Sequence, residues 1–295
     1  MRYTLYFTIS IFFLGSKAFS QVYFEYYDIV NQAEIAFLDN QYHKADSLYQ
    51  KAFYLVDRPF KEDYLLAALN SNKLKESEKT FHYLINGIKQ GLTLKRIKSK
   101  RKKLRYFIKG KHYTLLKKQY KLLREDHLGT LNIPLKEEID LMVKKDQRAR
   151  MPILGSSRQM KKTDMFNYDR LKEIIKENGN KWPGFSTIGE NTPKGKYNVT
   201  GTIILVLLHF NKAWIDELKP YLLEAVDEGE IYPYQLARVI DYKTINTGKF
   251  CMIYGTYFGV DICDCKQAEI ERKKVGFEPI QDYYRKVNAE YSCKE

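Results

Sequence analysis

Apolar residues recur three or four positions apart along most of the chain, the spacing of amphipathic helices. In the segment "EEIDLMVKKDQRAR" this spacing places Ile139, Met142 and Val143 on one inward face. Similar patterns predict helices at "NYDRLKEIIKENG", capped by Asn167, and at "NVTGTIILVLLHF", "KAWIDELKPYLLEAVDEG" and "PYQLARVIDY", with two more near 266–274 and 279–291. The pattern therefore predicts a mainly α protein.

A short pattern of small and aromatic residues occurs twice between residues 31 and 91. The copies are Tyr42-x2-Ala45-x3-Tyr49-x2-Ala52 and Leu74-x2-Ser77-x3-Phe81-x2-Leu84. They start 32 residues apart, at 42 and 74, close to the period of about 34 residues in tetratricopeptide repeats. The N-terminal half thus resembles a short tetratricopeptide-like array of helical hairpins. Two units need a neighbour to cover them, and the amphipathic segment 95–124, interrupted at Gly110, is expected to supply it.

One segment, "KFCMIYGTYFGVDICDC", has the β-branched and aromatic composition of strands. A hairpin with its turn at 256–258 would place Cys251 opposite Cys263 and leave Cys265 to pair with Cys293. Four cysteines alone permit three pairings. A metal site is not expected, because no second cysteine pair follows at zinc-site spacing, and no cofactor is predicted. With this hairpin the fold class becomes α+β overall.

The N-terminus predicts export. A positive Arg2, the apolar run Tyr3–Leu14 and the small residues Ala18 and Ser20 form a signal peptide over 1–20, cleaved before Gln21. The alternative is an uncleaved anchor, although the apolar run is shorter than the roughly 20 residues of a spanning helix. We expect no integral membrane segment after cleavage. A periplasmic or secreted protein would meet oxidising conditions, which favours disulfides.

The net charge of +14 is concentrated in one region. No acidic residue occurs between Lys79 and Arg124, whereas the rest of the chain is nearly balanced. The basic helices 95–124 are either a solvated surface or a docking face for another protein or an acidic surface such as anionic lipid. The predicted export disfavours nucleic acid as a partner. The linker "HLGTLNIP" separates this repeat region, 21–128, from a second domain, 135–295.

The order of motifs over residues 138–291 resembles an uncharacterised bacterial domain family. That family combines Asp-Gln-x-x-Arg, Trp-Pro, Gln-His, Asp-Arg and Gln-x-Tyr-Gly-Thr-Gln motifs. Its counterparts here are Asp146, Gln147, Arg150, Trp182, Pro183, His209, Asp241, Tyr254, Gly255 and Thr256. The resemblance implies a shared polar site, with Asp146, Gln147, Arg150, Trp182 and Thr256 as ligand-binding candidates.

Several polar positions of the family pattern are replaced in this chain. Leu208, Tyr242, Met252 and Tyr257 stand where the family has Gln, Arg, Gln and Gln, and Asn211 replaces an Asp. These replacements favour a non-enzymatic interaction or scaffold protein of the cell envelope.

The alternative is a hydrolase-like or small-molecule site. His209 and Asp241 are predicted to end adjacent helices, where the carboxylate would orient the imidazole as a general base. Tyr254 would complete this catalytic set.

Overall fold

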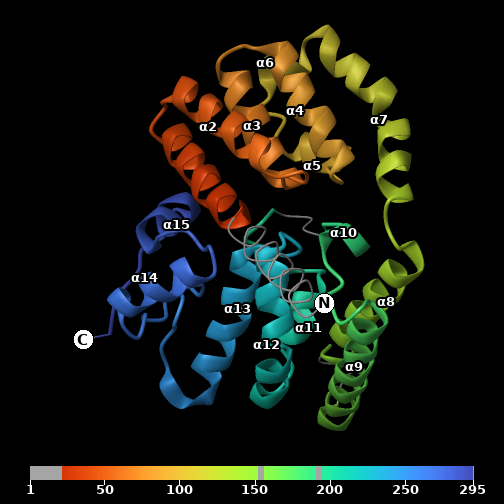
Figure 1. Cartoon of the computed structure of the whole chain (residues 1–295), viewed down its shortest axis with the longest axis vertical. Helices are drawn as coiled ribbons and strands as arrows, with labels where there is room; N and C mark the ends of the chain where they lie inside the picture. Colours follow the sequence, from red (N-terminus) through yellow and green to blue (C-terminus); the bar gives the residue numbers. More distant parts are fainter. Residues whose placement is uncertain (1–21, 152–155, 191–194, 295) are drawn as a thin grey trace, which may run out of the picture.

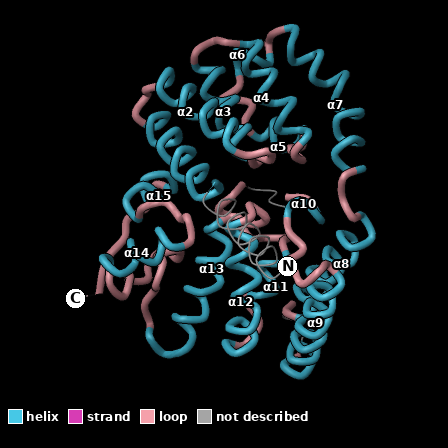
Figure 2. The backbone as a smooth tube through the Cα atoms, in the orientation of Figure 1, coloured by secondary structure: helices cyan, strands magenta, loops and turns pink. Residues whose placement is uncertain are grey.

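The computed structural model describes residues 22–151, 156–190 and 195–294. Within these ranges the regular structure is helical and no strand is formed (Figure 2). The predicted mainly α fold is thus confirmed. The predicted signal peptide, residues 1–20, lies outside the described residues. No described helix is both long and apolar enough to cross a bilayer.

The N-terminal half forms an upper group of helices that ends in one long helix descending along the side of the molecule (Figure 1). The group consists of a helix over 22–38, α2 (Tyr42–Leu55), α3 (Lys61–Lys73), α4 (Ser77–Lys89), α5 (Leu94–Ser99), α6 (Arg105–Ile108) and α7 (Lys111–Gly129). The predicted repeat positions lie largely on α2 and α4, and Ala45, Tyr49 and Leu84 are buried in the core of this group. Their assignment to tetratricopeptide-like repeats stays a prediction.

The C-terminal half forms a lower group of helices (Figure 1). Its members are α8 (Ile133–Ala149), α9 (Ser157–Glu177), α10 (Phe185–Ile188), α11 (Ile203–Leu207), α12 (Lys212–Asp227), α13 (Pro233–Thr244), a π-helical turn η1 (Ile245–Lys249), α14 (Cys265–Lys274) and α15 (Ile280–Val287). Ile139, Met142 and Val143 face its core as their spacing predicts.

The two groups are joined by a third apolar cluster, which we call the joint. It consists of Tyr26, Ile29, Val30, Ala52, Val56, Phe60 and Tyr232. The helix over 22–38 supplies three of these residues, although it belongs to the upper group. Its Tyr27 hydroxyl also donates to the Val226 carbonyl of α12 at 2.7 Å. The first described helix is therefore packed against both groups.

Five charged side chains, two of them buried and three largely buried, lie beside the joint, and we call them the ionic cluster: Glu34, Asp63, Lys196, Glu278 and Lys286. Lys286 Nζ lies 2.6 Å from Glu34 and 3.5 Å from Glu278. Burial alone would raise the pKa of Glu278, but Lys286, Lys196 and Arg272 together lower it to about 2. Burial raises the pKa of Asp63 to about 6, against the attraction of Lys196.

Three local predictions are wrong. The predicted hairpin is absent; Ile262 instead makes isolated parallel bridges to Met252 and Cys293. Asn167 does not begin a helix, because α9 already begins after Ser156, whose side chain accepts from Gln159 N at 3.2 Å. The predicted helix ending at His209 is also reduced to the short α11.

Candidate functional site

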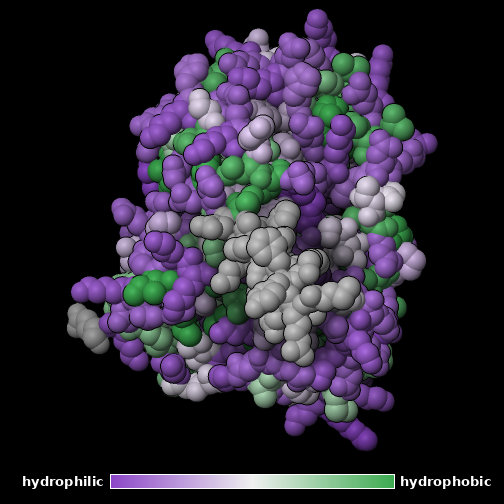
Figure 3. Space-filling model, in the orientation of Figure 1, coloured by the Kyte–Doolittle hydropathy of each residue, from purple (hydrophilic) through white to green (hydrophobic). Residues whose placement is uncertain are grey.

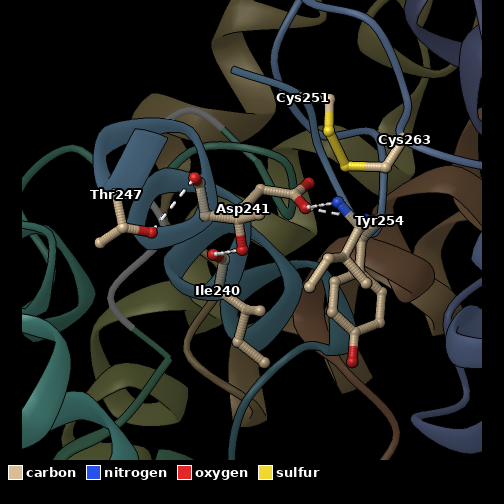
Figure 4. Close-up of a disulfide and its surroundings, with 8 residues drawn as sticks. Ile240, Asp241, Thr247, Cys251, Tyr254 and Cys263 are labelled. Atoms are coloured by element: carbon tan, nitrogen blue, oxygen red, sulfur yellow. Dashed lines mark hydrogen bonds between the residues drawn. A yellow bond between two sulfur atoms is a disulfide. The ribbon is translucent and has the colours of Figure 1, made fainter. Parts of the chain in front are cut away.

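Asp241 lies in the last turns of α13 and holds the Tyr-Gly-Thr segment (Figure 4). One carboxylate oxygen accepts from the backbone N–H groups of Ile253 and Tyr254, at 2.8 and 2.7 Å. The other accepts from the N–H and the hydroxyl of Thr256, both at 2.8 Å. Burial raises the pKa of Asp241, and these four hydrogen bonds oppose that shift. The carboxylate thus replaces the backbone partners that a strand would provide.

A buried guanidinium also supports the same segment. Arg272, fully buried on α14, donates to the Tyr254 carbonyl and to the Glu278 carbonyl, the latter at 2.6 Å. Its guanidinium carbon also lies 3.8 Å from the centre of the Phe277 ring. Asp241 and Arg272 together account for the Tyr-Gly-Thr motif as a structural element.

The two disulfides pair as predicted, Cys251 with Cys263 and Cys265 with Cys293, with Cα atoms 5.0 and 5.7 Å apart. Ile262 lies between the segments they connect: its N–H donates to the Ser292 carbonyl, and its carbonyl accepts from Lys294 N. The Cys251–Cys263 bridge therefore closes the segment that follows α13 (Figure 4), and the Cys265–Cys293 bridge ties the C-terminal tail to the start of α14.

His209 binds a different carboxylate from the one predicted. Its Nδ1 lies 2.9 Å from Oδ2 and 3.1 Å from Oδ1 of Asp146, which is fully buried at the end of α8. Asp241 is occupied by its four other donors, so the predicted His209–Asp241 pair is wrong. Tyr254, whose pKa burial raises to about 12, stands with Asp241.

Asp146 gathers three of the predicted residues into one polar cluster. Besides His209, it accepts from Gln147 Nε2 at 2.7 Å and from Arg150 Nη1 at 2.8 Å. The carboxylate can only accept, so His209 carries its hydrogen on Nδ1 and its Nε2 has a free lone pair when the ring is neutral. Within the described ranges, the His209 ring has Asp146 as its hydrogen-bonding partner. The arrangement positions an imidazole base.

Trp182 and Thr256, the other ligand-binding candidates, do not belong to this cluster. Trp182 is 4 % exposed and lines a small cavity with Ile139 and Ile204. Thr256 is fully buried against Asp241. The predicted residues thus divide into a polar cluster, a backbone-holding group and a core residue.

Two charged residues beside the polar cluster were missed. Asp164 of α9 binds Arg150, and Lys243 of α13 donates to the Leu208 carbonyl at 2.7 Å and to the Phe210 carbonyl at 2.5 Å. Burial lowers the pKa of Lys243 to about 8. A signal for Asp164 was present, because Ser156-x-x-Gln159 is a capping pattern that extends α9 to include it.

Comparison of the chain with protein-family models, with curated proteins and with solved structures gave no match. Both sequence resemblances therefore remain predictions, and the function has to be argued from the residues themselves.

Proposed function

We propose that this chain is an exported, non-enzymatic interaction protein of the cell envelope that attaches to an anionic lipid surface. The attachment site is the basic face, which we define as the exposed Lys and Arg residues of α5–α7 and their connections. These residues are Lys95, Lys98, Arg101, Lys102, Lys103, Arg105, Lys109, Lys111, Lys117, Lys118 and Lys121. The observation that carries the proposal is that these basic residues are all exposed and come from a stretch, 79–124, that contains no acidic residue.

The charge of the basic face is poorly compensated. No acidic residue occurs between 79 and 124, and the closest recorded ion pair on the face, Lys121–Glu125, spans 3.8 Å with both side chains well exposed. Such a surface pair contributes little. The face therefore carries a field that attracts a negatively charged surface over roughly a Debye length.

The composition of the face favours lipid over an acidic protein. Lysine predominates, and its ammonium is a point charge that suits many mobile headgroups better than a fixed carboxylate. Large apolar side chains are exposed among the lysines: Tyr106 at 51 %, Leu115 at 41 % and Leu122 at 63 %. Figure 3 shows hydrophobic side chains scattered among hydrophilic ones over this upper part. Side chains of this kind enter the headgroup region of a bilayer.

The exported location rests on two independent observations. The N-terminal residues have the composition of a signal peptide. Both cysteine pairs have disulfide geometry, which is typical of oxidising compartments.

The test is flotation of the full mature chain with vesicles. We expect binding to vesicles that contain phosphatidylglycerol and none to pure phosphatidylcholine. The triple variant Lys102→Glu, Lys103→Glu, Arg105→Glu should weaken binding at least about a hundredfold, since each basic residue near the membrane contributes about 1 kcal/mol.

The matched control is Arg158→Glu, Lys161→Glu, Lys162→Glu on α9, which makes the same change in net charge at exposed positions away from the basic face. It should keep most of the binding. Equal losses in both variants, or capture of an acidic protein without binding to anionic vesicles, would overturn the proposal.

A further inference from the structure

A cleft of about 530 Å³ lies where the upper and lower groups of helices meet. Its walls come from α3, α5 and α7 of the upper group and from α8 and the end of α10 of the lower group (Figure 1). The charged and ionisable residues that line it are Lys61, Glu62, Lys95, Arg96, Arg124, His127, Lys136 and Glu190. Its volume is in the range of sites for small molecules.

The acidic residues of this cleft are already bound by the protein. Glu62 accepts three hydrogen bonds from Arg96, at 2.7, 3.0 and 3.1 Å. Glu190 accepts from the Tyr232 hydroxyl at 2.5 Å and from Lys61 N at 3.0 Å. Because these hydrogen bonds occupy both carboxylates, Glu62 and Glu190 neutralise the other positive side chains of the cleft only weakly.

Arg124 lacks such compensation. Its Nη1 is buried and has no hydrogen-bond partner among the described residues. Burial lowers the pKa of Arg124, and only Tyr120 opposes this effect. Burial also lowers the pKa of Lys61, with further contributions from the positive charges of Arg124 and Arg96, although Glu190 and Glu62 oppose them. Arg124 is half-buried, so its positive charge is only partly hydrated in the free protein and would be stabilised by a negative charge in the cleft.

His127 adds a polar atom without adding charge. Its Nδ1 lies 2.9 Å from the Lys89 carbonyl, which can only accept, so Nδ1 carries the hydrogen. Burial, together with Arg124, lowers the pKa of His127 to about 4. The ring is thus neutral near pH 7 and the positive charge of the cleft comes from its Lys and Arg residues.

We propose that this cleft binds a small organic anion that carries phosphate or carboxylate groups, with Arg124 as the main anchor. An anion would pair with Arg124, which lines the cleft, and would offset the repulsion between Arg124 and Lys61. The cleft shares Lys95 with the basic face but is otherwise distinct from it. The site does not depend on attachment to lipid.

The test is calorimetric titration of the full mature chain with three probes: inorganic phosphate, pyrophosphate and citrate. We expect saturable binding of at least one probe and a rise in Tm, because the ligand binds the folded state. The phosphate probes and citrate distinguish a phosphoryl ligand from a carboxylate one. Binding should weaken with added salt.

Arg124→Gln should weaken binding at least about tenfold, the loss expected for one charge-assisted hydrogen bond. Its Tm without ligand should be unchanged or higher, since the variant removes an uncompensated charge. Arg148→Gln, at an exposed position of α8 outside both the cleft and the basic face, is the matched control and should bind the probe like the unmodified chain. The proposal is overturned if no probe saturates at millimolar concentration, or if Arg124→Gln binds as tightly as Arg148→Gln.

Discussion

At the scale of single residues, the sequence predicted where the polar sites lie but not which side chains pair there. His209 and Asp241 both lie at polar sites close to helix ends, as their sequence context predicts. Their partners depend on the chain path between them: the segment after η1 returns to Asp241 and supplies its N–H donors, so Asp146 is left for His209. Local spacing in the sequence cannot predict this chain path, because His209 and Asp146 are 63 positions apart.

Asp241→Ala should lower the free energy of unfolding by about 3–5 kcal/mol, because it leaves four buried donors without their acceptor. Urea denaturation followed by circular dichroism measures this change. The control is Asp216→Ala, whose side chain is 56 % exposed and pairs with Lys212 on the same helix. It should change stability by less than about 1 kcal/mol. Similar values for the two variants would show that Asp241 does not hold the segment.

At the scale of elements, periodicity predicted helices well and their ends less well. Ile139, Met142 and Val143 face the core because their spacing is that of a helix with one buried side. The start of α9 was misplaced, since Asn167 has the residue type of a cap but Ser156 forms it. The cysteine pairing was right although the hairpin was wrong. Met252, Tyr254 and Ile262 of this segment are buried, as apolar strand residues would be, but Asp241 and the disulfides determine its path.

One contact of the helix over 22–38 with the lower group, Tyr23 against Gly229, requires a glycine. Gly229, after α12, has φ +68°, and a Cβ there would overlap the Tyr23 ring. Gly229→Ala should therefore lower the free energy of unfolding by about 3 kcal/mol, the sum of the cost of a left-handed backbone conformation and of overpacking. Gly179→Ala is the matched control, because φ is +72° there and nothing lies within 4 Å.

The control should show only the backbone penalty of about 1–2 kcal/mol. Hydrogen exchange should also be faster in residues 22–38 of Gly229→Ala and unchanged there in Gly179→Ala. If the two variants lose the same stability and show the same exchange, Tyr23 does not pack on the lower group as described.

On the scale of the whole molecule, the joint and the ionic cluster could not be predicted from the sequence. Tyr26, Phe60 and Tyr232 each lie in a segment that reads as an ordinary helix or its flank, and only the tertiary arrangement brings them together. The same holds for Glu34 and Lys286, which appear as unremarkable surface charges in their own helices. Burial of opposite charges at one place requires both halves to be folded.

The ionic cluster should make stability depend on acid pH. The pKa of Glu278 falls from 4.5 to about 2 on folding, so its contribution is complete above pH 4.5 and is lost as pH falls through about 2. Between pH 4.5 and about 2, the free energy of unfolding of the unmodified chain should fall by about 3 kcal/mol more than that of Glu278→Gln. Urea denaturation at a series of pH values measures the difference.

Glu173→Gln serves as the control, because the Glu173 side chain is 64 % exposed. The free energy of unfolding of this variant should depend on pH in the same way as that of the unmodified chain. If Glu278→Gln shows the same dependence as Glu173→Gln, the Glu278 carboxylate is not stabilised by the cluster.

The side chain of Asn31 donates to Asp282, 251 positions away, and Lys286 pairs with Glu34 close by. During synthesis, the first described helix is therefore made long before α15, the last helix, which supplies the partners for both residues. Until α15 emerges, Glu34 lacks one of its two lysines, and the helix over 22–38 has only part of its final packing. Contacts this distant form late and slowly. The ionic cluster should thus be among the last parts of the molecule to assemble, and loss of either the helix over 22–38 or α15 should leave it incomplete.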